Sequence, residues 1–259
     1  MTISLFQQDI KWLDPEANYR KIEQVLVDNP QTDLLVLPEM CNTGFVTLPK
    51  PGQTEKAEVT ELRLIELARK YNTALCGSFA VSSQWPAADG QTTTVNFNRC
   101  YFVTPEGDVH HYDKHHLFRP GQEHAGYQAG NERVVVEWRG IRFMLCVCYD
   151  LRFPTWLRYR NDSPYDILVC VANWPAARQL AWETLLRARA IENQAYCIGV
   201  NRVGCDMMCE YRGGTCAIHP YGHAVASCTD NEETVCNFEP DMEKLMDFRR
   251  KFPSLDDMD

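Results

Sequence analysis

Residues 141–154 read IRFMLCVCYDLRFP, and this stretch decides the kind of fold that we expect. An apolar run typical of a buried strand ends at Cys148, and a polar turn leads into a helix that begins near Pro154. This position resembles a nucleophile elbow, because the sulfur is exposed at the sheet edge and nearby backbone amides can receive an oxyanion. Cys146 lies deeper in the strand, where a structural thiol is expected. The stretch therefore predicts an α/β enzyme with Cys148 as nucleophile.

Strand-like apolar runs alternate with helical patterns along the sequence, which predicts a layered α/β fold. Their order, with several hairpins, does not match the strict alternation of a TIM barrel or the single sheet of a flavodoxin-like fold. We expect two sheets packed face to face with helices outside. The strand-like runs cover residues 3–7, 33–38, 73–81, 97–103, 108–112, 133–138, 141–150, 166–173, 195–200, 215–219 and 223–228.

Helix and turn signals agree with this layered order. Asp14 is placed as an N-cap with Pro15 at the first helical position, and further helices are expected over residues 55–71, 155–161 and 178–193. Turn residues predict hairpins at 105–108, 139–140 and 219–222. No repeat or linker divides the chain, so a single domain over residues 1–259 is expected. The charged tail, residues 241–259, is expected either to dock on the body or on a partner subunit through its apolar residues or to remain solvated.

Composition excludes several classes of function. The 259 residues carry a formal net charge of -9 and contain no phosphate-binding glycine motif, which argues against a nucleic-acid or nucleotide partner. Neither a signal peptide nor an apolar run of membrane-spanning length is evident. We therefore expect a cytoplasmic protein without a membrane partner. Many of the 12 cysteines lie singly in apolar runs, where a thiol behaves as a small buried hydrophobe, so disulfides are not expected.

Two further segments carry candidate catalytic groups. In DLLVLPEM, residues 33–40, a buried strand ends at Glu39, where partial desolvation can bring a carboxylate into the range of a general base. A chance surface position is the alternative. In HHYDKHHLFRPGQEH, residues 110–124, Lys114 follows a strand among several histidines. Adjacent histidines in a strand point to opposite faces, so His115 and His116 are poor joint ligands and no metal is expected there.

A structural zinc site is a third hypothesis for part of the chain. The segment CDMMCEYRGGTCAIH, residues 205–219, contains three cysteines and a histidine. Their spacing is not a common zinc pattern, and a strand over residues 215–218 would turn successive side chains to opposite faces. We expect no metal here either. The potential ligands are Cys205, Cys209, Cys216 and His219.

Together these segments resemble the nitrilase superfamily of carbon-nitrogen hydrolases, and within it the omega-amidase-like branch. The resemblance rests on Glu39 in LPEM, Lys114 in YDKHHLF and Cys148 in CYDLRFP. The second glutamate of the family, seven residues before a glycine, falls on Glu123 with Gly130. Further agreement covers nearly the whole chain, in NWP (173–175), RARAIENQAY (187–196), NRVG (201–204) and YRGGT (211–215).

The resemblance implies a four-layer α-β-β-α sandwich that forms a homodimer or higher homo-oligomer and hydrolyses a small amide without a cofactor. An amide is a poor electrophile, so the thiol needs a base and the developing oxyanion needs a positive group. Glu39 is the expected base, Lys114 and the backbone N–H of Tyr149 are expected to hold the oxyanion, and Glu123 is expected to support Lys114 or to join proton transfer.

The branch resemblance points to omega-amides of 2-oxo dicarboxylic acids, such as 2-oxoglutaramate. Such a substrate carries a carboxylate, for which Arg119 and Arg152 are candidate ligands. Phe45 and Trp174 are expected to form the pocket wall, and Asn173 beside Trp174 is a further substrate-binding candidate. A nitrilase, an N-carbamoyl hydrolase and a non-catalytic binding protein on the same fold remain the alternatives.

Overall fold

The computed structural model describes residues 1–86 and 91–258, and two sheets dominate it. The strands of the first sheet are β1 (Ile3–Gln7), β2 (Leu34–Val36), β3 (Glu55–Lys56), β4 (Ala74–Pro86), β5 (Thr92–Val103), β6 (Val109–Asp113) and β15 (Thr234–Phe238). The strands of the second sheet are β7 (Val135–Trp138), β8 (Ile141–Val147), β9 (Ile167–Ala172), β10 (Tyr196–Asn201), β13 (Cys216–Ile218) and β14 (Ala224–Ser227). A separate hairpin pairs β11 (Val203–Cys205) with β12 (Glu210–Arg212).

Parallel strands lie at the centre of each sheet and antiparallel strands at the edges. The first sheet has the order β15-β1-β2-β4-β5-β6, with β3 beside β4, and the second has the order β14-β13-β10-β9-β8-β7. β1, β2 and β4 run parallel, as do β8, β9 and β10. Because parallel strands of one sheet end at the same edge, the loops that follow β1, β2 and β4 leave the first sheet together, and those that follow β8, β9 and β10 leave the second sheet together.

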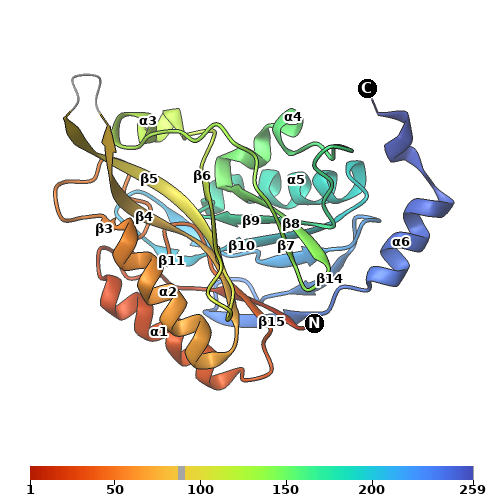
Figure 1. The fold of residues 1–259 in the computed structure, drawn as a ribbon, viewed down its shortest axis with the longest axis horizontal. Helices are drawn as coiled ribbons and strands as arrows, with labels where there is room; N and C mark the ends of the chain where they lie inside the picture. Colours follow the sequence, from red (N-terminus) through yellow and green to blue (C-terminus); the bar gives the residue numbers. More distant parts are fainter. Residues whose placement is uncertain (87–90, 259) are drawn as a thin grey trace.

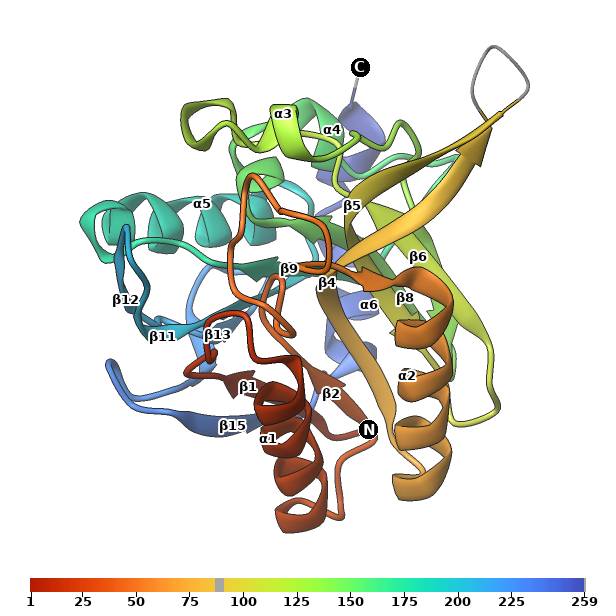
Figure 2. The same cartoon turned by 90° about the vertical axis from the view of Figure 1, so that its left-hand side faces the viewer.

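Helices cover the outer face of each sheet, as Figures 1 and 2 show. The long helices are α1 (Pro15–Asp28), α2 (Ala57–Tyr71), α5 (Gln179–Glu192) and α6 (Met242–Lys251), and the short ones are α3 (Glu123–Gly126) and α4 (Pro154–Leu157). The carboxylate of Asp14 accepts a hydrogen bond from Ala17 N and caps α1 as expected. α1 and α2 pack against the first sheet and α5 against the second, so the predicted four-layer α-β-β-α order is confirmed.

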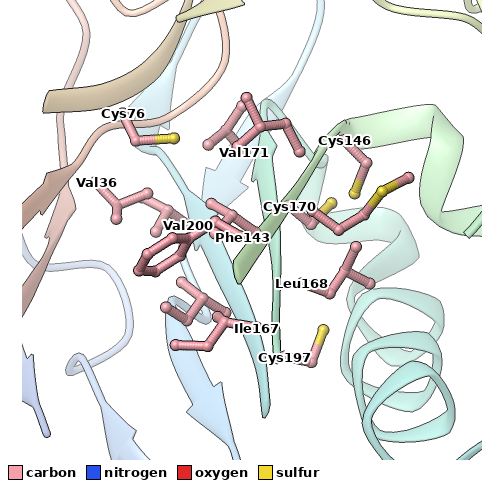
Figure 3. Packing of buried hydrophobic residues seen from close by; sticks show 14 of the residues in the cluster. Val36, Cys76, Phe143, Cys146, Ile167, Leu168, Cys170, Val171, Cys197 and Val200 are labelled. Carbon is pink, nitrogen blue, oxygen red and sulfur yellow. The ribbon is translucent and has the colours of Figure 1, made fainter. Parts of the chain in front are cut away.

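The strands have apolar residues on both faces because each sheet is covered on both sides. Val36 faces the second sheet, whereas the preceding residue, Leu35, packs under the helices α1 and α2. Figure 3 shows the same alternation in the second sheet. Val171 points toward the first sheet, and Cys170 and Cys197 point toward α5. These thiols fill small core spaces, and all the cysteines of the chain are free.

Several boundaries differ from the predictions. The three predicted hairpin turns are confirmed, since they join β5 to β6, β7 to β8 and β13 to β14. β15, β11 and β12 were not predicted, because these short strands have mixed polarity. The helix predicted over 155–161 is only the single turn of α4. β4 and β5 extend beyond the predicted runs into an exposed, polar hairpin that has no core-facing pattern.

The C-terminal tail docks on the body of the protein. Leu245 of α6 is buried in the main core, whereas Phe252 is 61% exposed. Arg249 donates to Asp166 Oδ1 at 2.9 Å and to the backbone oxygens of Tyr165 and Gln194. The docked alternative for this segment is therefore confirmed through residue 258. Within the described residues, no helix has the length and apolarity needed to cross a membrane.

Candidate functional site

The candidate catalytic residues follow the ends of strands from both sheets. Glu39 lies in the turn after β2, Lys114 directly follows β6, and Cys148 directly follows β8. Glu123 is the first residue of α3, in the loop after Lys114. The sandwich brings these segments, which are up to 109 positions apart in the chain, to one edge of the sheet pair. The strand pattern of the sequence alone does not predict that these four residues meet.

Lys114 forms the centre of a buried charge cluster. Its Nζ lies 2.8 Å from Glu39 Oε1 and 2.9 Å from Glu123 Oε2, and all three side chains are fully buried. The ammonium also lies 5.2 Å from the centre of the Phe45 ring. A buried charge is tolerated only when it is paired, so each carboxylate compensates the lysine and the lysine separates the two carboxylates.

Asn98 is buried and holds both carboxylates. Its Nδ2 donates to Glu39 Oε1 at 2.8 Å and to Glu123 Oε1 at 2.9 Å. Its Oδ1 accepts from Ser78 Oγ at 2.7 Å, which fixes the orientation of the amide. Sequence reasoning missed Asn98 and Ser78. The available signal was the position of Ser78 and Asn98 in the buried, mainly apolar parts of β4 and β5.

Asn173 connects Glu39 to the cysteine. The backbone N–H of Asn173 donates to Glu39 Oε2 at 2.8 Å, and its side-chain Nδ2 donates to the backbone oxygen of Glu39 at 2.6 Å. The Cys148 sulfur lies 4.0 Å from the backbone oxygen of Asn173. Cys148 has φ 47, a left-handed conformation that is strained for a residue with a side chain. The tight turn expected at the end of the strand is therefore present.

The pKa shifts follow from burial and charge. Burial raises the pKa of the Cys148 thiol well above its usual range, and the Glu39 carboxylate adds to the effect while Lys114 opposes it. Burial disfavours the charged form of Lys114, but Glu123 and Glu39 outweigh burial and raise its pKa well above the ordinary value. Burial also raises the pKa of Glu123, against the effect of Lys114. The site therefore holds a charged lysine beside a protonated thiol.

A cavity of about 320 Å³ opens at Cys148. Of the four candidate catalytic residues, Cys148 lines this cavity, while Glu39, Lys114 and Glu123 lie fully buried behind it. Aromatic rings form much of the wall. The cavity-lining residues include Trp12, Phe45, Phe118, Tyr149, Arg152, Asn173, Trp174, Arg178, Asp206, Met208, Cys209 and Tyr211. This set includes all the predicted substrate-binding residues except Arg119.

Arg119 lies elsewhere. It is exposed and lines a different cavity together with His115 and His124. The cavity at Cys148 is instead lined by Arg178, which sequence reasoning missed because a lone arginine before a helix resembles any solvated charge. The structure therefore brings Arg152 to the cavity but not Arg119.

The potential zinc ligands, for which no metal was expected, are spread over different elements. Cys205 belongs to β11, Cys216 belongs to β13, and His219 stacks on His223 in the turn that follows β13. Cys209 lines the wall of the cavity that contains Cys148. Within residues 1–86 and 91–258, no group of three or more cysteine, histidine or acidic residues is arranged to hold a metal ion.

The layered α/β fold, with a cysteine beside a buried glutamate-lysine pair, defines a class of hydrolases, and comparison with known proteins gives the family. The sequence model of the carbon-nitrogen hydrolase family matches residues 2–250. This chain belongs to that family, in the nitrilase superfamily, and is a hydrolase that acts on carbon-nitrogen bonds.

Individual relatives place the chain more closely. It is 43% identical to "Omega-amidase YafV" of Escherichia coli strain K12 over 260 residues, which cover 100% of this chain and 97% of that protein. It is 31% identical to "2-oxoglutaramate amidase" of Bacillus subtilis, over 99% of this chain and 97% of that protein. A similar solved structure is the crystal structure of XC1258 from Xanthomonas campestris, a CN-hydrolase superfamily protein with an arsenic adduct in its active site. It matches this chain with a TM-score of 0.90 and 36% sequence identity, and the match covers 100% of this chain and 97% of that chain. The chain therefore lies in the omega-amidase-like branch, among amidases.

Proposed function

We propose that the protein hydrolyses the omega-amide of small 2-oxo dicarboxylic acid monoamides, of the 2-oxoglutaramate type, to the acid and ammonia. Two observations support this substrate class. The omega-amidase and 2-oxoglutaramate amidase relatives match the chain over nearly its whole length. The cavity at Cys148 has a volume suited to a small molecule rather than to a peptide chain.

In the first half of the reaction, the Cys148 sulfur attacks the amide carbonyl carbon. Because the thiol has a raised pKa, it needs a base, and Glu39 takes its proton. The electron pair of the C=O bond moves to oxygen, and the oxyanion is stabilised by the Lys114 ammonium and the backbone N–H of Tyr149. Collapse of the tetrahedral intermediate breaks the C–N bond, and Glu39 returns the proton to the leaving ammonia. The product of this half is a thioester at Cys148.

In the second half, water replaces ammonia. Glu39 accepts a proton from the water, the oxygen attacks the thioester carbon, and the carboxylic acid leaves as the proton returns to the Cys148 sulfur. Atoms balance as one amide plus one water giving one acid plus one ammonia. Glu123 acts through Lys114, because its carboxylate lies 2.9 Å from Nζ, whereas Glu39 and Lys114 are the charged groups that act on the Cys148 thiol.

The observation that carries this proposal is the contact of Cys148 with Asn173, which itself holds Glu39 by two hydrogen bonds. The arsenic adduct in the active site of the Xanthomonas campestris relative fits a thiol in such a site, since arsenic binds soft sulfur ligands. The proposal includes a cytoplasmic location and a homodimer or higher homo-oligomer, which the resemblance implies.

The test is ammonia release from 2-oxoglutaramate by the wild-type protein and by Cys148→Ala. We expect rapid release by the wild type and nearly complete loss in the variant. Simple nitriles and N-carbamoyl amino acids form the comparison panel. Activity confined to a nitrile or carbamoyl compound would show that the same residues cleave a different bond, and would reject the proposed substrate class. Activity that survives in Cys148→Ala would overturn the assignment of the nucleophile.

A further inference from the structure

The cavity at Cys148 has an unusual balance of charge for this protein. Its wall carries two arginines, Arg152 and Arg178, and a single carboxylate, Asp206. The whole chain has a formal net charge of -9. The net negative charge of the protein repels anions, whereas the excess of positive charge on this cavity wall attracts them locally.

The carboxylate of Asp206 is occupied by its own loop. Its Oδ1 accepts from the backbone N–H groups of Met208 and Cys209 at 2.8 and 2.9 Å, and its Oδ2 accepts from the Tyr211 hydroxyl at 2.7 Å. Both oxygens therefore hold the turn between β11 and β12 in place. Asp206 Oδ2 also lies 4.0 Å from Arg202 Nη1, and among the described residues neither Arg152 nor Arg178 lies within ion-pair distance of this carboxylate.

Both arginines contact aromatic rings, and neither has an anionic partner within residues 1–86 and 91–258. The guanidinium carbon of Arg152 lies 4.9 Å from the centre of the Trp174 ring, and that of Arg178 lies 5.4 Å from the centre of the Phe118 ring. Among the described residues, neither side chain makes a hydrogen bond or an ion pair. Stacking leaves the edges of a guanidinium, where its N–H donors lie, free for a carboxylate.

We propose that Arg152 and Arg178 together bind the carboxylate of the substrate at the end remote from the scissile amide, and so select monoamides of dicarboxylic acids over neutral amides. This inference rests on the proposed function. A 2-oxo acid suits the pair well, because its carboxylate and adjacent keto oxygen present acceptors in one plane to the two planar donors. The aromatic walls then enclose the short carbon chain, and the amide carbon reaches Cys148.

The test compares a charged and a neutral amide of the same length. Hydrolysis of 2-oxoglutaramate and of pentanamide is measured for the wild type and for Arg178→Gln, Arg152→Gln and the double variant. We expect each single change to lower kcat/KM for 2-oxoglutaramate by about 10- to 100-fold, mainly through KM, since one charge-assisted contact is lost. Pentanamide should change by less than about 3-fold, because it has no carboxylate to lose a contact. Arg20→Gln, an exposed arginine on α1 that does not line this cavity, is the matched control.

Binding of 2-oxoglutarate, measured by titration calorimetry, separates this inference from the proposed function. The wild type should bind this anion and the double variant should bind it at least about 100-fold more weakly. Equal losses for the charged and the neutral amide, or unchanged anion binding in the double variant, would overturn the role of the two arginines. If the wild type binds 2-oxoglutarate but does not hydrolyse 2-oxoglutaramate, the anion site formed by the two arginines is supported and the proposed substrate is rejected.

Discussion

Asp150 Oδ1 lies 2.8 Å from both the backbone nitrogen and the Nδ1 atom of His116, so one buried carboxylate joins the loop of Lys114 to the turn of Cys148. Asp150 belongs to the same turn as Cys148, and its Oδ2 accepts from the backbone N–H of Val147 at 3.0 Å. Because His116 lies only two positions after Lys114, these contacts fix the distance between the two candidate catalytic loops.

The first prediction concerns this link. In Asp150→Asn an amide donor replaces one acceptor oxygen, so at least one of the N–H groups around it is left buried without a partner. We expect a loss of about 1–3 kcal/mol in the free energy of unfolding. We also expect a fall in kcat with little change in KM, because Cys148 and Lys114 lose their relative position. Urea unfolding and steady-state kinetics measure the two effects.

The matched control for this change is Asp162→Asn, an exposed carboxylate on the loop before β9. It should alter the free energy of unfolding by less than about 0.5 kcal/mol and leave kcat unchanged. A wild-type kcat in Asp150→Asn would show that the loops keep their positions without the carboxylate.

The second prediction concerns the buried charge cluster. Lys114→Met leaves Glu39 and Glu123 buried without a counter-charge, and we expect a loss of about 3–5 kcal/mol in the free energy of unfolding together with loss of activity. In the double variant with Glu123→Gln, one of the two charges is removed, so part of the stability should return while activity does not. Thermal unfolding of both variants measures this. A double variant less stable than Lys114→Met would contradict the charge argument.

The third prediction concerns the pH dependence of Cys148. Since its pKa is raised well above the ordinary value of 9.0, the neutral thiol predominates at neutral pH, and thiolate forms only as pH rises through the raised value. Alkylation of Cys148 by iodoacetamide, followed by mass spectrometry of its peptide, should therefore still be increasing above pH 9. A rate that levels off in the neutral range would contradict a raised pKa.

The variant Glu39→Gln sharpens this experiment. The negative charge of Glu39 contributes to the raised pKa of Cys148, so its removal should move the alkylation profile toward lower pH. Amide hydrolysis should be lost at the same time, because the base is missing. If thiolate forms at lower pH while turnover is lost, the effect of Glu39 on the pKa of Cys148 is separated from its role as the base.

The fourth prediction concerns the docked tail. Arg249→Ala removes the contacts of α6 with Asp166, Tyr165 and Gln194, and we expect a loss of about 1–3 kcal/mol with faster hydrogen exchange in α6. Arg250→Ala is the control, because its partner Asp247 lies in the same exposed helix, and it should cost less than about 0.5 kcal/mol. Equal exchange in the two variants would argue against this anchor.

The contact between Arg249 of α6 and Asp166 should weaken only at acidic pH. Burial alone would raise the pKa of Asp166, but Arg142 and Arg249 outweigh it, and the pKa is lowered from its ordinary value of 3.8. The stabilising contribution is therefore fully present above pH 3.8 and is lost as pH falls through the lowered pKa. Detachment of α6 on acidification should accordingly occur below pH 3.8 and not near neutrality.

The sequence by itself determined the layers and the identity of the chemical groups. Apolar runs and helix signals are local properties, so they predicted the two covered sheets, the cap at Asp14 and the strand that ends at Cys148. That the chain is one domain over residues 1–259 stays a prediction. The length of helix α4 was overestimated and strand β15 was not predicted, because the formation of short elements depends more on their neighbours than on their own residues.

Only the tertiary structure decided which polar residues meet. Asn98 contacts Glu39 across 59 positions of the chain, and no local pattern encodes such a contact. The choice between Arg119 and Arg178 at the cavity likewise depends on how loops from separate strands fold over the sheet edge. Local periodicity specifies which face of an element is buried, whereas the position of a side chain in the site is set by the packing of elements remote in sequence.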